Sequence, residues 1–390
     1  MKLRPLTSAM YAVTHACNLQ CRYCFVKQEH LYTNYDVAKR LVHFLISNAN
    51  GTDDVPNITF FGGEPFLMWD EIIKPLVLYI REDLKTPFTL SITTNGTLVD
   101  EDKLKFMKDN GVGILFSCDG DKITQDYNRV THSGESSFSL IEHNVDKIIQ
   151  YFPNTHFRST VIPDTCQYTF DNIMFAERHK YKTFFTTPNI FQKWNDDSKY
   201  ELANQIKMYS DYYINSYRCG RSPIKFTSME ETMKRICDIN TASSKGDYRK
   251  APYCCGEGKC GMSSNRFCGV SPDGMIYSCQ EMTSNVSSDS IFYIGNLFDG
   301  IDNKKRAALV EMYCPEKATG LNCKECKYDR VCDGGCVANN YFINGDIHIN
   351  QPDYCWWRQL LLDNAIYIVQ TLGNDKNEAF RDYWVKINER

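Results

Sequence analysis

The stretch Cys17-Asn-Leu-Gln-Cys21-Arg-Tyr-Cys24 places three cysteines in C-x3-C-x2-C spacing. Thiolates are soft ligands that suit iron–sulfur clusters. Three thiolates would hold three corners of a cubane and leave the fourth iron open, as an open position marks a catalytic zinc site. The alternative is a zinc knuckle, which would need a fourth ligand such as His15 or His30. We expect a redox iron–sulfur cluster on this loop.

Around this loop, short β-rich runs alternate with longer amphipathic runs up to about Tyr217. Six strand–helix units in series imply a parallel sheet with right-handed crossovers, either open or closed into a partial barrel. The predicted strands are Tyr11–His15, Ile58–Phe61, Thr89–Thr93, Gly113–Ser117, Phe157–Ile162 and Thr183–Thr187. The predicted helices are Tyr35–Asn48, Trp69–Tyr79, Glu101–Asp109, Ser137–Tyr151, Thr169–Arg178 and Lys199–Tyr217. Loops after strands carry the chemistry of such sheets, and the cysteine loop and the Gly62-Gly63 pair both lie there.

After about Cys219 the alternation stops and cysteine and glycine become frequent. Little of this part could build a large apolar core, so metal would have to substitute for it. The predicted fold class is α/β: a partial (β/α)6 TIM-like barrel, then a small cysteine-rich domain of β-hairpins and short helices. The predicted boundaries are 1–218 for the barrel, 219–253 for a bridge, 254–358 for the cysteine-rich domain and 359–390 for a C-terminal helix and tail.

Composition narrows the class of protein. The net charge of −4 gives no basic field for nucleic acid, and no apolar stretch is long enough to span a membrane. The first 16 residues lack the apolar core of a signal peptide, so we expect a cytoplasmic protein. Eighteen cysteines in a reducing compartment point to metal rather than to a secreted disulfide scaffold.

The cysteine triplet, with Tyr23 just before its last cysteine, resembles the signature of the radical S-adenosylmethionine (SAM) superfamily. Gly62-Gly63-Glu64-Pro65 is similar to the family's glycine-rich motif, and the segments 94–97 and 117–120 also match. The resemblance implies that Glu64 meets the SAM amino group, that Ser117 contacts the carboxylate and ribose region, and that Arg158 or Arg129 pairs with the carboxylate. The implied cofactor-binding residues are Tyr23, Gly62, Gly63, Glu64, Asn95, Ser117, Arg129 and Arg158.

The same resemblance implies the chemistry. The reduced cluster on Cys17, Cys21 and Cys24 would cleave SAM, and the resulting 5′-deoxyadenosyl radical would take a hydrogen atom from the substrate. The cofactor supplies the reactive group, and the protein supplies orientation and a dry cavity. A flavodoxin or ferredoxin is the implied electron donor.

A second cysteine array resembles the SPASM domain, which in its fullest form binds two auxiliary [4Fe–4S] clusters, for three clusters in all. The first auxiliary cluster would use Cys260, Cys279 and Cys336. Its fourth ligand would be Cys254 or Cys255, unless a substrate thiolate binds there instead. The ligands of the second auxiliary cluster would be Cys323, Cys326, Cys332 and Cys355. Two zinc sites are the alternative. The cysteines outside this register, mostly expected as core or surface thiols, are Cys118, Cys166, Cys219, Cys237, Cys268 and Cys314.

SPASM enzymes mostly modify peptides and proteins. Sulfatase maturases carry a general-base Asp whose counterpart here is Ser228, although Glu230 or Glu231 could substitute. A serine is a poor proton acceptor near neutral pH, so we favour a peptide maturase that forms an intramolecular thioether or carbon–carbon crosslink. The alternatives are a maturase that makes formylglycine and a non-catalytic iron–sulfur or zinc protein. Only 16 residues precede Cys17, so we expect the ribosomally made precursor peptide to bind the barrel, the SPASM region or a separate leader-binding protein.

Overall fold

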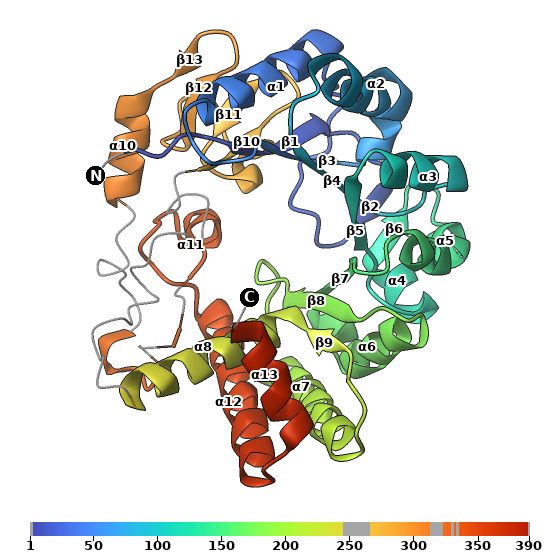
Figure 1. Ribbon diagram of the computed structural model, residues 1–390, viewed down its shortest axis with the longest axis vertical. Coiled ribbons are helices and arrows are strands. Elements are labelled where there is room, and N and C mark those ends of the chain that lie inside the picture. Colours follow the sequence, from blue (N-terminus) through green and yellow to red (C-terminus); the bar gives the residue numbers. More distant parts are fainter. Residues whose placement is uncertain (1–2, 245–265, 313–322, 329–330, 333–334, 389–390) are drawn as a thin grey trace. The chain divides into compact units, whose positions relative to one another are not determined.

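The computed structural model describes residues 3–244, 266–312, 323–328, 331–332 and 335–388. These residues form two compact units (Figure 1). The first unit is drawn from Met1–Cys118, Arg129–Thr155 and Gly256–Cys314. The second unit is drawn from Asp119–Asn128, His156–Cys255 and Pro315–Arg390. Each unit therefore combines segments that are far apart in the sequence.

The first unit is built on a mixed sheet. Its parallel strands are β10 (Phe267–Val270), β1 (Ser8–Thr14), β3 (Asn57–Gly62), β4 (Thr89–Thr94) and β5 (Val112–Ser117), which lie side by side in that order. The antiparallel strands β11 (Met275–Tyr277), β12 (Tyr293–Asn296) and β13 (Gly300–Ile301) extend the sheet beyond β10. A separate antiparallel ribbon joins β2 (Leu19–Cys21) to β6 (Arg129–Thr131).

Helices connect the parallel strands of the first unit, as crossovers between parallel strands require. They are α1 (Tyr35–Ala49), α3 (Glu101–Asp109) and a helical run that passes through Pro65–Met68, Trp69–Ile73, α2 (Lys74–Leu78) and Tyr79–Leu84. The unit also contains α5 (Ser137–Tyr151), which follows β6, and α10 (Asn303–Met312), which follows β13. The side chains of Asn34, Asp100 and Ser136 cap α1, α3 and α5 by accepting a backbone N–H of the first turn. The alternating burial of β4 and β5 places one face of each strand in the core.

The second unit has three parallel strands, β7 (His156–Val161), β8 (Thr183–Pro188) and β9 (Lys225–Phe226). Its helical elements are α4 (Lys122–Asn128), Pro163–Tyr168, α6 (Thr169–Arg178), α7 (Asp196–Arg218), α8 (Thr227–Ser244), Cys323–Glu325, α11 (Val337–Asn344), α12 (Pro352–Asn374) and α13 (Glu378–Asn388). The helix α12 packs along α7 and α8 (Figure 1). The core of this unit is rich in aromatic side chains such as Tyr209, Phe184 and Phe226.

The α/β class with a parallel sheet is confirmed, and each of the six predicted strands overlaps an observed one. Within the described residues of either unit, no strand pairing closes a barrel. The predicted hairpins correspond to β10–β13, and α12 and α13 supply the predicted C-terminal helix and tail. The four predicted domain boundaries stay a prediction.

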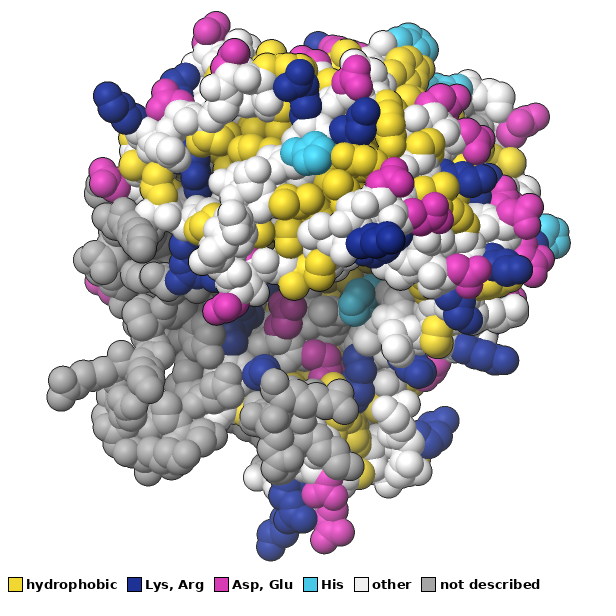
Figure 2. All heavy atoms as spheres, turned by 45° about the horizontal axis from the view of Figure 1, so that its top comes forward, with side chains coloured by type: hydrophobic (Ala, Val, Ile, Leu, Met, Phe, Trp, Pro, Cys, Tyr) yellow, Lys and Arg dark blue, Asp and Glu magenta, His cyan; other side chains and the backbone are white. Residues whose placement is uncertain are grey.

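The described residues on the face drawn in Figure 2 form no field of one charge. In Figure 2, Lys and Arg side chains alternate with Asp and Glu side chains over the described residues of the face in view. Among the residues that the structure describes, no helix combines the length and the apolar character needed to cross a membrane.

Candidate active site

The three cysteines of the first motif lie on the loop that follows β1. Cys21 ends β2, which pairs with β6 so that Cys21 faces Arg129 across the ribbon. The Cys24 amide donates to the Cys21 carbonyl over 3.1 Å, and the His132 ring nitrogen lies 3.0 Å from the Cys17 carbonyl oxygen. The β2–β6 ribbon thus fixes the backbone between the first and last cysteine.

The electrostatics of this loop suit a cationic cluster. Burial raises the pKa of the Cys17 thiol to about 12, and the negative charges of Glu64, Cys21 and Cys24 add to that rise. Three thiolates this close repel one another until iron offsets their charge. No three ligating side chains among the described residues surround one point closely enough for a single metal ion. A cubane does not require such a point, because each cysteine binds a different iron.

Gly62 and Gly63 bring the backbone after β3 against the cysteine loop. The Gly63 amide donates to the Thr14 carbonyl and the Glu64 amide donates to the Ala16 carbonyl, both over 2.9 Å. A Cβ atom on Gly63 would lie 2.0 Å from the Ala16 carbonyl oxygen, which is far inside contact distance. Glycine is needed here because only a residue without a Cβ allows this approach.

Glu64 joins the glycine motif to the end of β4. Its carboxylate is fully buried, and it accepts from the Thr94 hydroxyl over 2.8 Å, from the Asn95 amide over 2.8 Å and from the Phe66 amide over 3.1 Å. Burial raises the pKa of Glu64 to about 7, against the lowering effect of these hydrogen bonds. The carboxylate therefore braces two loops, and its predicted contact with SAM stays a prediction.

Asn95 links the Glu64 carboxylate to the loop that carries the cysteines. Its side-chain amide donates to the Asn18 oxygen over 2.9 Å and lies 3.8 Å from the Cys17 sulfur. Asn18 in turn donates to the Thr97 hydroxyl over 2.7 Å. The sequence interpretation quoted Asn18 and Thr97 within their motifs but assigned them no role. Their place within the two motifs was the one sequence feature that could have pointed to this role.

The remaining predicted SAM contacts are divided between the units. The Arg129 guanidinium is buried and lies 5.5 Å from the centre of the Tyr23 ring, beside the cysteine loop. Ser117 ends β5 in the same unit. Arg158 lies on β7 in the second unit, where its guanidinium stacks 4.9 Å from the Phe185 ring centre. The structure thus gathers Tyr23 and Arg129 at the cysteine loop.

The motifs that carry this geometry fall within a known family. Residues 11–173 match the model of the Radical SAM superfamily. These residues form a radical SAM domain. Every predicted SAM-binding residue lies within it.

Known proteins of similar sequence include a sulfatase-maturating enzyme and a radical SAM cyclopropyl synthase. The chain is 24% identical over 359 residues to the cysteine-type anaerobic sulfatase-maturating enzyme of Clostridium perfringens, covering 85% of this chain and 89% of that enzyme. It is 26% identical over 378 residues to the radical SAM cyclopropyl synthase TigE of Paramaledivibacter caminithermalis, covering 91% and 72%. Its fold is similar to native anSMEcpe with bound AdoMet and Cp18Cys peptide, with a TM-score of 0.73, 19% identity and coverage of 94% and 99%.

Beyond the radical SAM domain, four cysteines of the second array gather in the second unit. Burial raises the pKa of Cys355 to about 11, and the charges of Cys332, Cys323 and Cys326 add to that rise. These are the four ligands predicted for one auxiliary cluster. Their proximity supports that grouping, although three sequence segments contribute them.

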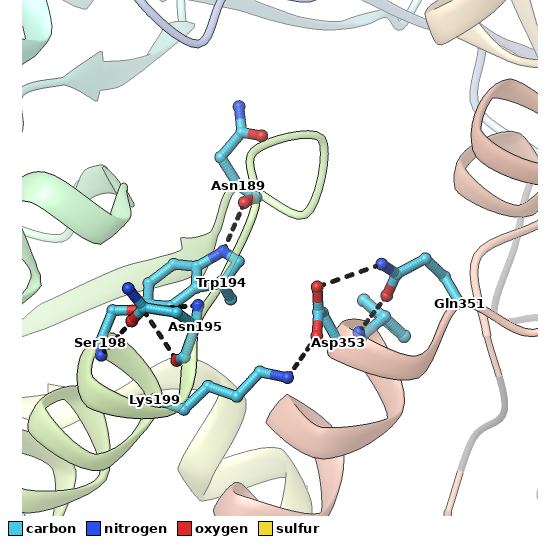
Figure 3. A network of polar contacts seen from close by, with 8 residues as sticks. Asn189, Trp194, Asn195, Ser198, Lys199, Gln351 and Asp353 are labelled. Atoms are coloured by element: carbon cyan, nitrogen blue, oxygen red, sulfur yellow. Dashed lines mark hydrogen bonds and ion pairs between the residues drawn. The ribbon is translucent and has the colours of Figure 1, made fainter.

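Cys355 lies in the first turn of α12, which is braced against α7. The Lys199 ammonium lies 2.6 Å from the Asp353 carboxylate, and the rings of Trp194 and Trp356 are 5.9 Å apart. Figure 3 shows the ion pair between Lys199 and Asp353 together with Trp194, which also donates to the Asn189 carbonyl over 2.7 Å. The first turn of α12, which carries Cys355, is therefore held by an ion pair and by a contact between two tryptophan rings.

The predicted ligands of the other auxiliary cluster are only partly described. Cys279 is buried in the first unit, and Cys336 precedes α11 in the second. Cys254, Cys255 and Cys260 lie outside the described residues, as does Cys314. None of the 14 described cysteines forms a disulfide, and the assignment of metal to them stays a prediction. Cys118, Cys166 and Cys268 are buried and Cys219 is exposed, as expected of core and surface thiols.

Proposed function

We propose that this chain is a radical SAM enzyme that modifies a ribosomally made peptide by forming an intramolecular thioether or carbon–carbon crosslink. The observation that carries the proposal is the buried Glu64 carboxylate and its neighbours. Through Asn95 and Asn18, hydrogen bonds connect the glycine motif to the loop that carries Cys17. A simple electron carrier has no need of that connection, which argues against the non-catalytic alternative.

In this proposal Cys17, Cys21 and Cys24 hold the SAM-binding cluster. When bound, that cluster and SAM would supply a 5′-deoxyadenosyl radical able to take hydrogen from the peptide. Glu64 keeps the glycine loop in place against the cysteine loop, so that exposed backbone groups of Gly62 and Gly63 can face SAM. Ser117, Arg129 and Arg158 are the proposed contacts of its carboxylate and ribose, and a guanidinium fork suits a carboxylate.

We assign the remaining cysteines to two auxiliary [4Fe–4S] clusters. The mutual charge effects of Cys323, Cys326, Cys332 and Cys355 support one of them. The other would use Cys260, Cys279 and Cys336, completed by Cys254, by Cys255 or by a substrate thiolate. A flavodoxin or ferredoxin in the reducing cytoplasm would supply electrons, and a separate leader-binding protein is a further proposed partner.

The second candidate function is formation of formylglycine, which the similarity to sulfatase-maturating enzymes favours. Such a reaction calls for a carboxylate base. Position 228 is a buried serine, and the Glu230 carboxylate accepts from the Tyr383 hydroxyl over 2.8 Å within a cluster that includes the Lys225 ammonium. One Glu230 oxygen is thus held by Tyr383, while the other is buried with no hydrogen-bond partner among the described residues, away from solvent. This placement within a tyrosine cluster favours the crosslink.

Mass spectrometry of a peptide co-expressed with the enzyme separates the two reactions. A crosslink removes two hydrogen atoms and leaves no aldehyde. Formylglycine made from cysteine removes two hydrogens and exchanges sulfur for oxygen, whereas formylglycine made from serine removes only two hydrogens. A hydrazide reagent, which reacts with the aldehyde alone, resolves the serine case. An aldehyde product would replace our first candidate with the second, and an unchanged mass would contradict both.

A further inference from the structure

Two side-chain amides of the second unit lie against cysteine sulfurs. The cysteines concerned belong to one set, which we call the Cys355 group: Cys323, Cys326, Cys332 and Cys355. The Asn350 amide nitrogen lies 3.5 Å from the Cys323 sulfur, and the Gln359 amide nitrogen lies 3.6 Å from the Cys355 sulfur. In both contacts nitrogen donates and sulfur accepts. Two of the four sulfurs of the group therefore receive a hydrogen bond from a neutral amide.

Gln359 reaches its sulfur along the helix α12. It follows Cys355 by one helical turn, and side chains at this spacing lie on the same face. Helical side chains also lean toward the N-terminus, so the Gln359 amide is carried back over the Cys355 sulfur. A thiolate can only accept a hydrogen bond, and the amide therefore presents its nitrogen rather than its oxygen.

Asn340, in α11, sets the orientation of the Asn350 amide. The Asn340 oxygen accepts from the Gln351 N–H over 3.3 Å, and its nitrogen donates to the Ile347 carbonyl over 3.0 Å. The same nitrogen donates to the Asn350 oxygen over 3.3 Å. Because a backbone N–H can only donate and a carbonyl can only accept, these bonds fix which end of each amide is nitrogen. The Asn350 nitrogen is therefore the atom that faces Cys323.

Gly335 leaves the space that the Asn350 amide occupies. A Cβ atom on Gly335 would lie 2.5 Å from the Asn350 side-chain oxygen, which is far inside contact distance. A larger residue at this position would push the amide away from its bond to Asn340. The backbone just before Cys336 is thus shaped to admit this one side chain.

Hydrogen bonds of this kind act on the redox chemistry of an iron–sulfur cluster. Four cysteine thiolates are the ligand set of a [4Fe–4S] cluster, so the Cys355 group fits such a cluster. Reduction adds negative charge to the cluster and its sulfurs, and an N–H donor is bonded more strongly by the more negative acceptor. Donors to the sulfurs therefore favour the reduced form and raise the reduction potential.

We propose that Asn350 and Gln359 raise the reduction potential of the auxiliary cluster on the Cys355 group, by donating hydrogen bonds to two of its cysteine sulfurs. This inference rests on the proposed function, which assigns a [4Fe–4S] cluster to these four cysteines. Both amides are neutral, so they shift the potential without changing the net charge around the cluster. The cluster accepts an electron more readily with them than without them.

The test is a redox titration of the anaerobically reconstituted full-length chain, followed by electron paramagnetic resonance of the reduced clusters. The signal of this cluster is the component that disappears in Cys355→Ser. Asn350→Ala and Gln359→Met should each lower the ratio of reduced to oxidised cluster about tenfold at a fixed potential, which is about 59 mV in the midpoint of a one-electron couple. The double variant should show the sum of the two shifts, because the amides bond different sulfurs.

Two control variants separate this effect from a general loosening of the structure. Gln370→Met removes the same amide from an exposed position further along α12 and should leave the midpoint unchanged. Asn344→Ala removes a 2.8 Å hydrogen bond to the Ile349 carbonyl, next to Asn350, and should leave it unchanged as well. Iron analysis of every variant shows whether the cluster is retained.

An unchanged midpoint in Asn350→Ala or Gln359→Met would overturn the role of that amide, and an equal shift in the control variants would overturn both. Loss of the cluster iron from a variant would replace tuning by a purely structural role for that residue. If Cys355→Ser removes no component of the signal, the assignment of the cluster itself fails. The failure of the proposed function is therefore distinguishable from the failure of this inference.

Discussion

Replacing Glu64 by glutamine should change how stability depends on pH. Glu64 is fully buried, and its pKa rises from 4.5 to about 7 on folding, with burial as the largest cause. Because the folded protein holds this proton more tightly than the unfolded chain, the carboxylate lowers the free energy of unfolding as pH rises from 4.5 through 7. Glutamine does not titrate, so the variant should lack this loss.

The magnitude follows from the two pKa values. Between pH 5.5 and pH 8, linkage gives wild type a loss of about 2 kcal/mol relative to Glu64→Gln. The glutamine amide also faces the Asn95 N–H in place of an acceptor, which costs the variant about 1–3 kcal/mol at every pH. That cost to the free energy of unfolding is the same at every pH, whereas the loss in wild type grows as the pH rises.

The assay is anaerobic urea denaturation of both reconstituted proteins at several pH values. The exposed Glu231 gives a matched control, since Glu231→Gln should follow the wild-type slope. A constant difference between wild type and Glu64→Gln from pH 5.5 to pH 8 would refute the account of Glu64 as a buried carboxylate with a raised pKa.

Three further outcomes are expected. Cys355→Ser should lose about four of roughly twelve irons per chain while SAM cleavage persists, as iron analysis and high-performance liquid chromatography would show; stoichiometric zinc in wild type would contradict the clusters. Asn18→Ala should slow SAM cleavage about tenfold, the effect of one lost positioning hydrogen bond, with the iron content retained; an unchanged rate would show that the bond to Asn95 is dispensable. Gly63→Ala should destabilise the protein by about 1–3 kcal/mol in the same denaturation assay, because the new Cβ overlaps the cysteine loop; Gly373→Ala, where a Cβ meets nothing within 4 Å, should not.

The sequence predicted what depends on local pattern. Short β-rich runs marked the strands: Ile58–Phe61 is mostly apolar and predicted β3, and Thr89–Thr93 alternates polar and apolar residues and predicted β4. The cysteine and glycine motifs then located the site, since loops after parallel strands meet at one edge. Both motifs lie within residues 11–173, the part that matches the Radical SAM model.

The features that the sequence did not predict depend on contacts between segments that are far apart in the chain. The β2–β6 ribbon pairs two three-residue strands more than 100 residues apart, and such strands carry no periodicity. The parallel pairing of β10 with β1 joins Phe267 to Ser8, which no local pattern indicates. That the His15 ring has no hydrogen-bond partner among the described residues could be seen only once its neighbours were placed. The helix through Pro65 was predicted too short, because its first turns are irregular rather than α-helical.

The most direct measurement of the central claim is the release of 5′-deoxyadenosine from SAM. Anaerobically reconstituted protein, reduced with dithionite, should form it, and a variant with Cys17, Cys21 and Cys24 all changed to alanine should not, although it keeps the auxiliary iron. Formation by the triple variant at the wild-type rate, or no formation by wild type with its clusters intact, would contradict the account.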